Sequence, residues 1–120
     1  GLERIAMFIQ KIDNVFDIEW DSNGTKYSDL FMLNEKEFSE YNFTSASPDL
    51  LFTFFESYEK DCIRLVKLNL ILPAYEHCIK ASHIFNLMDY RGLISVSERQ
   101  AYILKVRNLA RLCCKSWIEN

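Results

Sequence analysis

Apolar residues recur at helical spacing from the first residues of the chain. The opening stretch, LERIAMFIQKI, places Leu2, Ile5, Ala6, Ile9 and Ile12 three, one, three and three residues apart. Spacings of this kind put the side chains on one face of an α-helix. The pattern therefore predicts a helix over residues 1–12.

Turn signals then separate a second helix from a third. Residues 13–29 are acidic and contain Asn23-Gly24, which predicts a loop, and a helix is expected from about Leu30 to Tyr41. Ser47 followed by Pro48 is a typical helix start, because Ser can cap and Pro suits the first helical position. We expect the third helix to run from Pro48 to about Leu70.

Two more helices complete the pattern. One restarts at Pro73 and ends by Gly92, and the last follows a capping box formed by Ser95 and Glu98. Each of the three long helices carries a stripe of mainly apolar residues, which predicts the face that packs into the hydrophobic core. The stripes are Leu51, Phe55, Tyr58, Cys62 and Leu65; Ala74, Cys78, Ala81, Phe85 and Met88; and Ile103, Val106, Ala110, Cys113 and Trp117.

These elements predict an all-α fold, a bundle or array of about five helices. We divide the chain into a helix at 1–12, a loop with a short helix at 13–46, and a helical domain at 47–120. Composition agrees with a globular domain, with 49% hydrophobic residues, 26% charged residues and only 3 Gly and 2 Pro. No apolar run approaches the roughly 20 residues that span a bilayer, so no membrane association is expected.

Charge is distributed unevenly along the chain. Residues 1–61 carry 5 basic and 13 acidic side chains, whereas residues 91–120 carry 6 basic and 2 acidic ones. Arg107, Arg111 and Lys115 are four residues apart and form one ridge on the last helix, without an acidic partner inside the ridge. The ridge is either a solvated face or a surface that meets an anionic partner.

Candidate chemistry in the residues themselves is sparse. The four cysteines lack zinc-binding or redox spacing, which favours buried, reduced thiols in a cytosolic protein.

Residues 19–30 resemble a calcium loop, but the twelfth position is Leu30 where a bidentate Glu is required. His77 and His83 are six residues apart, on different helix faces, so no metal site is expected.

Arg4 stands out because it lies in the first turn of a helix. A cation is mildly unfavourable there, whereas Glu3 suits the positive end of the helix dipole. An anion such as phosphate, shared between Arg4 and the helix terminus, would explain the arginine. The alternative is an exposed arginine paired with a nearby carboxylate.

Longer segments carry a family resemblance. GLERIAMFIQ resembles the third signature motif of class II aminoacyl-tRNA synthetases. The segments YNF, LLFTFFESYEK, LPAYEHCIKASHIFNLMD and ISVSERQAYILKVRNL resemble, in order, the alpha subunit of the bacterial two-subunit glycyl-tRNA synthetase. The resemblance covers nearly all 120 residues. It implies the C-terminal part of that subunit, beginning at the third motif, with residues 1–12 as the motif's helix.

The resemblance also implies an activity, a site and partners. The enzyme is a glycine–tRNA ligase that activates glycine with ATP and Mg²⁺ and transfers it to tRNA-Gly in the cytoplasm. Arg4 inherits the catalytic contact to the ATP phosphates, Glu3 a supporting place in that site, and no metal ligand is assigned. The partners are the beta subunit, a second alpha subunit, tRNA-Gly, glycine and ATP.

Two functions stay open for this chain. It is part of the ligase, inactive and without a cofactor when alone, or it is a helical interaction module that docks the beta subunit or tRNA without chemistry of its own.

Overall fold

The computed structural model describes residues 1–119, and among these it contains five α-helices, two shorter helical turns and no strand. The predicted all-α fold is confirmed. The chain forms two compact units, residues 1–42 and 43–120 by their contacts, and we describe each by itself. The elements are α1 (Leu2–Gln10), the 3₁₀ turn η1 (Val15–Asp17), α2 (Tyr27–Glu40), the π-helical turn η2 (Tyr41–Ser45), α3 (Pro48–Lys67), α4 (Ile71–Tyr90) and α5 (Val96–Glu119).

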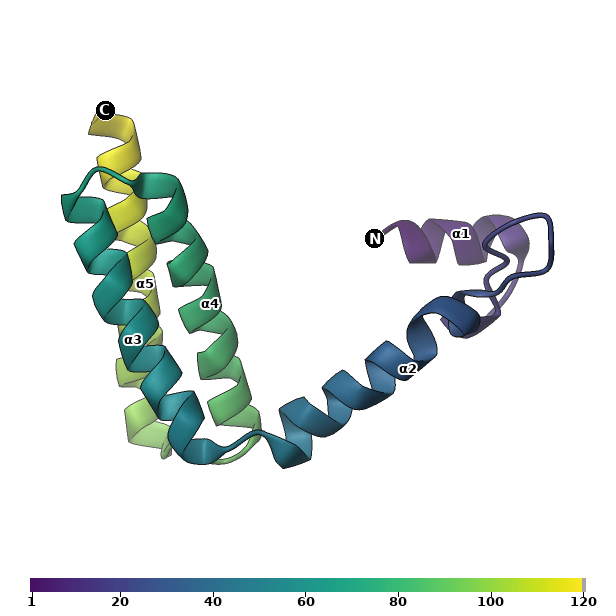
Figure 1. The fold of residues 1–120 in the computed structure, drawn as a ribbon, viewed down its shortest axis with the longest axis horizontal. Coiled ribbons are helices and arrows are strands. Elements are labelled where there is room, and N and C mark those ends of the chain that lie inside the picture. Colours follow the sequence, from purple (N-terminus) through teal and green to yellow (C-terminus); the bar gives the residue numbers. More distant parts are fainter. Residues whose placement is uncertain (120) are drawn as a thin grey trace. The chain divides into compact units, whose positions relative to one another are not determined.

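The second unit is a three-helix bundle in which α3, α4 and α5 run side by side (Figure 1). The predicted stripes of α3 and α4 supply most of its core, which confirms that part of the pattern. Phe55 of α3 is fully buried and meets the ring of Tyr102 on α5 edge-on, with centroids 4.8 Å apart. The three helices therefore share one core. Its buried members on α3 and α4 are Leu51, Phe55, Cys62, Leu65, Ile71, Ala74, Cys78, Ala81, Ile84, Phe85, Leu87 and Met88.

The predicted stripe of α5 is only partly correct. Cys113 is buried, and Val106 and Ala110 pack against the core, but Leu109 is also buried and Trp117 is 61% exposed. The physical reason is length. α5 has 24 residues and α3 and α4 have 20 each, so the last turns of α5 extend past the turn that joins α3 to α4 (Figure 1).

Helix starts follow the predicted chemistry with three corrections, the first of which is that α4 begins at Ile71 rather than at Pro73. At α5 the Ser95 hydroxyl accepts a hydrogen bond from the Glu98 backbone N–H, and the Glu98 carboxylate accepts one from the Ser95 N–H, so the capping box is confirmed. Ser47 is the N-cap of α3, but its side chain makes no capping bond. α2 begins at Tyr27 rather than Leu30, because the Asp29 carboxylate accepts a hydrogen bond from the Lys26 N–H.

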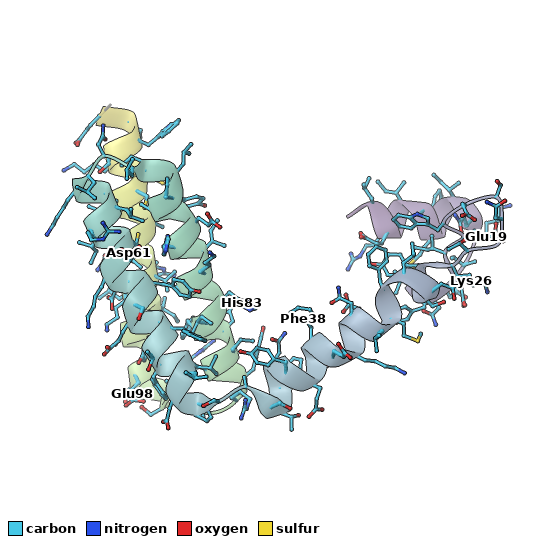
Figure 2. All side chains as sticks on the ribbon, in the orientation of Figure 1. Glu19, Lys26, Phe38, Asp61, His83 and Glu98 are labelled. Carbon is cyan, nitrogen blue, oxygen red and sulfur yellow. The ribbon has the colours of Figure 1, made fainter. Side chains whose placement is uncertain are left out.

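In the first unit, aromatic side chains and a hydrogen-bonded loop hold α1, η1 and α2. Trp20, Tyr27 and Phe31 contact one another, with ring centroids 4.6 to 6.4 Å apart. Gln10 at the end of α1 both donates to and accepts from the backbone of Glu19. Glu19 and Lys26, labelled in Figure 2, are paired in an isolated antiparallel bridge. The loop after α1 is therefore ordered by local contacts.

The acidic turn that resembles a calcium loop is closed by its own hydrogen bonds. Asp21 accepts from the backbone N–H groups of Asn23 and Thr25 and from the Thr25 hydroxyl. The bond from the Asn23 backbone is the main reason that the pKa of Asp21 is lowered. The turn is therefore held by its own hydrogen bonds.

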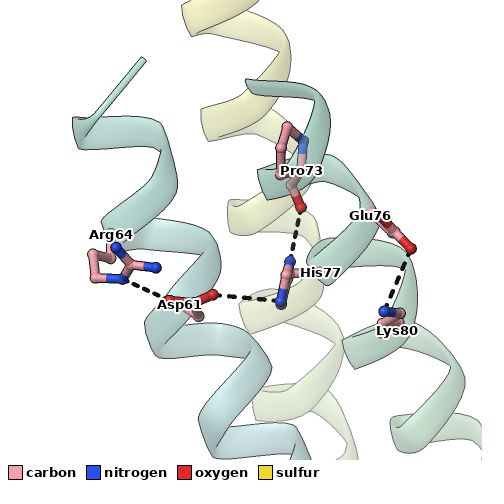
Figure 3. Close-up of polar contacts among 6 residues, drawn as sticks. All are labelled: Asp61, Arg64, Pro73, Glu76, His77 and Lys80. Carbon is pink, nitrogen blue, oxygen red and sulfur yellow. Dashed lines mark hydrogen bonds and ion pairs between the residues drawn. The ribbon is translucent and has the colours of Figure 1, made fainter. Parts of the chain in front are cut away.

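An Asp61–His77 contact links α3 to α4 (Figure 3). His77 Nε2 lies 3.4 Å from Asp61 Oδ2, and Arg64 Nε donates to Asp61 Oδ1 at 2.6 Å. The hydrogen bond from Arg64 is the main reason that the pKa of the Asp61 carboxyl lies below its ordinary value, and the electrostatic interactions with Arg64 and His77 act in the same direction.

We expect Asp61→Asn to weaken the fall of the unfolding free energy with decreasing pH. A carboxyl with a lowered folded-state pKa stabilises the fold above its unfolded pKa of about 4, and that contribution is lost as pH falls through the folded value. Urea midpoints measured from pH 7 to pH 2.5 should therefore fall less steeply in the variant than in the wild type. Glu56→Gln, on the same helix, is the control. Identical acid limbs for Asp61→Asn and the wild type would contradict the assignment.

Candidate functional site

The residues predicted to meet phosphate lie in the first turn of α1. Gly1 is the N-cap of α1, and because glycine has no side chain, the terminus has no side-chain capping bond. A β-carbon on Gly1 would lie 2.8 Å from Glu3 Oε2, so the Glu3 carboxylate is folded back over the helix terminus. Such a position agrees with the attraction of a helix N-terminus for negative charge.

Arg4 is exposed, and within residues 1–119 the structure gives it no ion pair. The alternative of an arginine held by a nearby carboxylate is therefore not what the described residues show. The guanidinium is available to an anion, and a guanidinium can bind phosphate oxygens through two parallel hydrogen bonds.

The apolar face of α1 is also exposed. Leu2, Ile5, Phe8 and Ile9 are each at least 57% exposed, and α1 has no buried residue. The stripe seen in the sequence is thus a real helix face, but the first unit has little core to cover it. Ile18 is its one buried hydrophobic residue among those described.

The basic ridge of α5 is divided by the structure. Arg107 and Arg111 are exposed and have no ion pair within residues 1–119, whereas Lys115 lies 3.7 Å from Glu119. The ridge itself holds no acidic partner, as predicted, but Lys115 has one at Glu119, one turn beyond the ridge. Nearby cations are also paired: Arg99 with Asp89, and Lys105 with Glu59. Two arginines remain available to a partner.

Three of the four cysteines are buried and free, as expected, and Cys114 is exposed. Burial raises the pKa of Cys62 to about 12, and it also raises the pKa of Cys78 and of Cys113. Cys62 Sγ lies 3.7 Å from Cys113 Sγ inside the bundle. The expectation of a buried thiol is wrong for Cys114, because its neighbour Cys113 takes the inward position on α5.

A thiol-reactive reagent should distinguish these cysteines. We expect one fast-reacting thiol in the native protein, removed by Cys114→Ser, and four in denaturant, because a thiolate must be both formed and reachable to react. The measurement is absorbance on mixing with a disulfide reagent such as dithionitrobenzoate. Fast reaction of two or more thiols under native conditions would contradict the burial described above.

The histidines and acidic residues do not form a metal cluster in the described part of the chain. His83 is exposed, and His77 is partly buried against Asp61 and Tyr58. No group of three His, Cys, Asp or Glu side chains within residues 1–119 is placed to hold a metal ion. No helix over the same residues is both long and apolar enough to cross a bilayer.

Comparison with known families identifies the chain. The chain belongs to the tRNA synthetases, a class of ligases. The family model that matches is described as glycyl-tRNA synthetase alpha subunit, and it covers residues 1–120. The chain belongs to the glycyl-tRNA synthetase alpha subunit family.

Proposed function

We propose that this chain serves a glycine–tRNA ligase of class II, which joins glycine to ATP, releases pyrophosphate, and passes the glycyl group to tRNA-Gly. The family match over residues 1–120 is the observation that carries the proposal. The reaction belongs to protein synthesis in the cytoplasm, and its participants are glycine, ATP and tRNA-Gly.

Arg4 is the residue that we assign to the chemistry. Its exposed guanidinium, next to the uncapped N-terminus of α1, fits the phosphates of ATP. Negative charge builds on the departing pyrophosphate during adenylate formation, and a fixed positive charge at that place lowers the barrier. Glu3 has a supporting role, since its carboxylate already lies over Gly1 at the same helix terminus.

Magnesium accompanies ATP in such enzymes, where it neutralises phosphate charge. Among the described residues, no three His, Cys, Asp or Glu side chains converge. We therefore assign no step to the metal and no ligand in this chain.

The 120-residue chain by itself is expected to be inactive. Glycine activation needs a polar, enclosed pocket, whereas the pocket of about 270 Å³ between α4 and α5 is lined by apolar side chains. Glycine-dependent ATP–pyrophosphate exchange should be absent for the chain and present for the alpha subunit assembled with beta. Exchange by the purified chain would contradict this assignment.

A second candidate function concerns the three-helix unit alone. We propose that it also serves as an interaction module for the beta subunit or tRNA-Gly, in an enzyme that contains two alpha subunits. Arg107 and Arg111 favour this candidate, because both are exposed and lack an ion pair within residues 1–119.

A further inference from the structure

An apolar groove of about 270 Å³ lies between the start of α4 and the end of α5. Exposed apolar side chains border it from both helices: Leu72 is 69% exposed, Trp117 61% and Ile118 82%. The groove is lined by Ile71, Leu72, Tyr75, Cys113, Cys114, Trp117 and Ile118. Its lining contains no charged side chain, so it suits apolar groups.

The two available arginines lie on the same face of α5 as this groove. Arg107, Arg111, Cys114 and Ile118 follow one another at spacings of four, three and four residues, which places them along one helical stripe. The stripe begins with two cations and ends in the wall of the groove. Its length, from Arg107 to Ile118, is about 17 Å at 1.5 Å per residue.

We infer that this surface, which we call the α5 docking surface, binds an acidic amphipathic helix of a protein partner. Apolar side chains of that helix enter the groove, and carboxylates about one turn apart meet Arg107 and Arg111. Helix-in-groove binding uses anchors of this spacing, and guanidinium–carboxylate pairs fix the orientation. The inference rests on the proposed function, since the beta subunit is the partner that would supply the helix.

Charge complementarity decides between a protein helix and the phosphate backbone of an RNA. Two arginines alone would give a nucleic acid only two phosphate contacts. A backbone laid along the stripe would also leave the aliphatic part of the groove, Ile71, Leu72 and Ile118, facing water or charge. A helix with acidic and apolar positions satisfies both halves of the surface.

The experiment measures the affinity of the alpha subunit for purified beta subunit by isothermal titration at several salt concentrations. Arg107→Glu/Arg111→Glu should weaken binding about a hundredfold and flatten its salt dependence, because like charges would then face one another. Ile118→Ser should weaken binding about tenfold through the loss of one apolar anchor. These side chains are exposed, so neither variant should alter the helical circular dichroism or the melting temperature.

Matched controls separate the surface from net charge and general exposure. Lys60→Glu/Lys80→Glu, on α3 and α4, changes the net charge by the same amount as Arg107→Glu/Arg111→Glu. Val96→Ser is the control for Ile118→Ser, because it removes an apolar side chain that is 85% exposed at the other end of α5. Both controls should bind beta as the wild type does.

Other outcomes would overturn the inference. If the Arg107/Arg111 variant assembles normally with beta and only tRNA binding weakens, the occupant is nucleic acid. If Ile118→Ser changes only the alpha–alpha equilibrium in sedimentation, the occupant is a second copy. Unchanged affinities for beta, tRNA and alpha would show a solvated face. Wild-type alpha that fails to bind beta would overturn the proposed assembly itself, whereas normal binding by every variant overturns only the docking surface.

Discussion

Replacing Arg4 with alanine in the alpha subunit is expected to slow glycyl-adenylate formation about a hundredfold. Removing one preorganised charge contact to a developing negative charge costs about 3 kcal/mol in the transition state. Single-turnover formation of adenylate, followed at saturating ATP and glycine, measures this step. The loss should appear mainly in the rate constant, because the phosphate charge increases as pyrophosphate departs.

Two further variants define the role of Arg4. Arg4→Lys keeps the charge but loses the paired donors of the guanidinium, so its rate should lie between those of the wild type and Arg4→Ala. Lys36→Ala removes another exposed cation of the first unit and should leave the rate unchanged. A near-normal rate for Arg4→Ala would show that Arg4 is a surface residue with no part in the reaction.

Truncation of Phe55 to alanine is expected to destabilise the three-helix unit by about 3 to 5 kcal/mol. The side chain is 1% exposed, and its ring contacts Tyr102 of α5, so its removal leaves a cavity where α3 meets α5. The free energy of unfolding, obtained from urea titration of the helical circular dichroism, gives the value.

Phe54 provides the matched control, because it precedes Phe55 on the same helix and is 36% exposed. Phe54→Ala should cost less than about 1.5 kcal/mol, since part of the side chain already faces water. If Phe55→Ala leaves the chain unfolded at room temperature, Phe55→Leu tests the same site with a smaller loss of unfolding free energy. Equal effects of Phe54→Ala and Phe55→Ala would contradict the described core.

Periodicity predicted the core well where a helix is covered along its whole length. The stripe of α4 is buried at every predicted position, because α3 and α5 pack against it. Periodicity alone says nothing about where a neighbouring helix ends, which explains the error at Trp117. The same limit applies to α1, whose apolar face is well formed by its sequence and yet exposed in the structure.

The candidate site was predicted more from resemblance than from spacing. Arg4 in a first turn was compatible with two explanations, and the structure favours an available guanidinium because it gives Arg4 no ion pair within residues 1–119. The groove could not be predicted, since Leu72 and Ile118 are distant in sequence and meet only after the bundle folds. The pairing of Lys115 was not predicted, because its partner, Glu119, lies one turn beyond the ridge.

Charging of tRNA with glycine tests the proposed function most directly. The alpha subunit, assembled with beta and supplied with ATP, Mg²⁺, labelled amino acid and tRNA, should attach glycine to tRNA-Gly and attach neither alanine nor serine. Either subunit alone should produce little charged tRNA. Equal charging with alanine or serine, or no charging with glycine by an intact assembly, would contradict the assignment of this chain to a glycine–tRNA ligase.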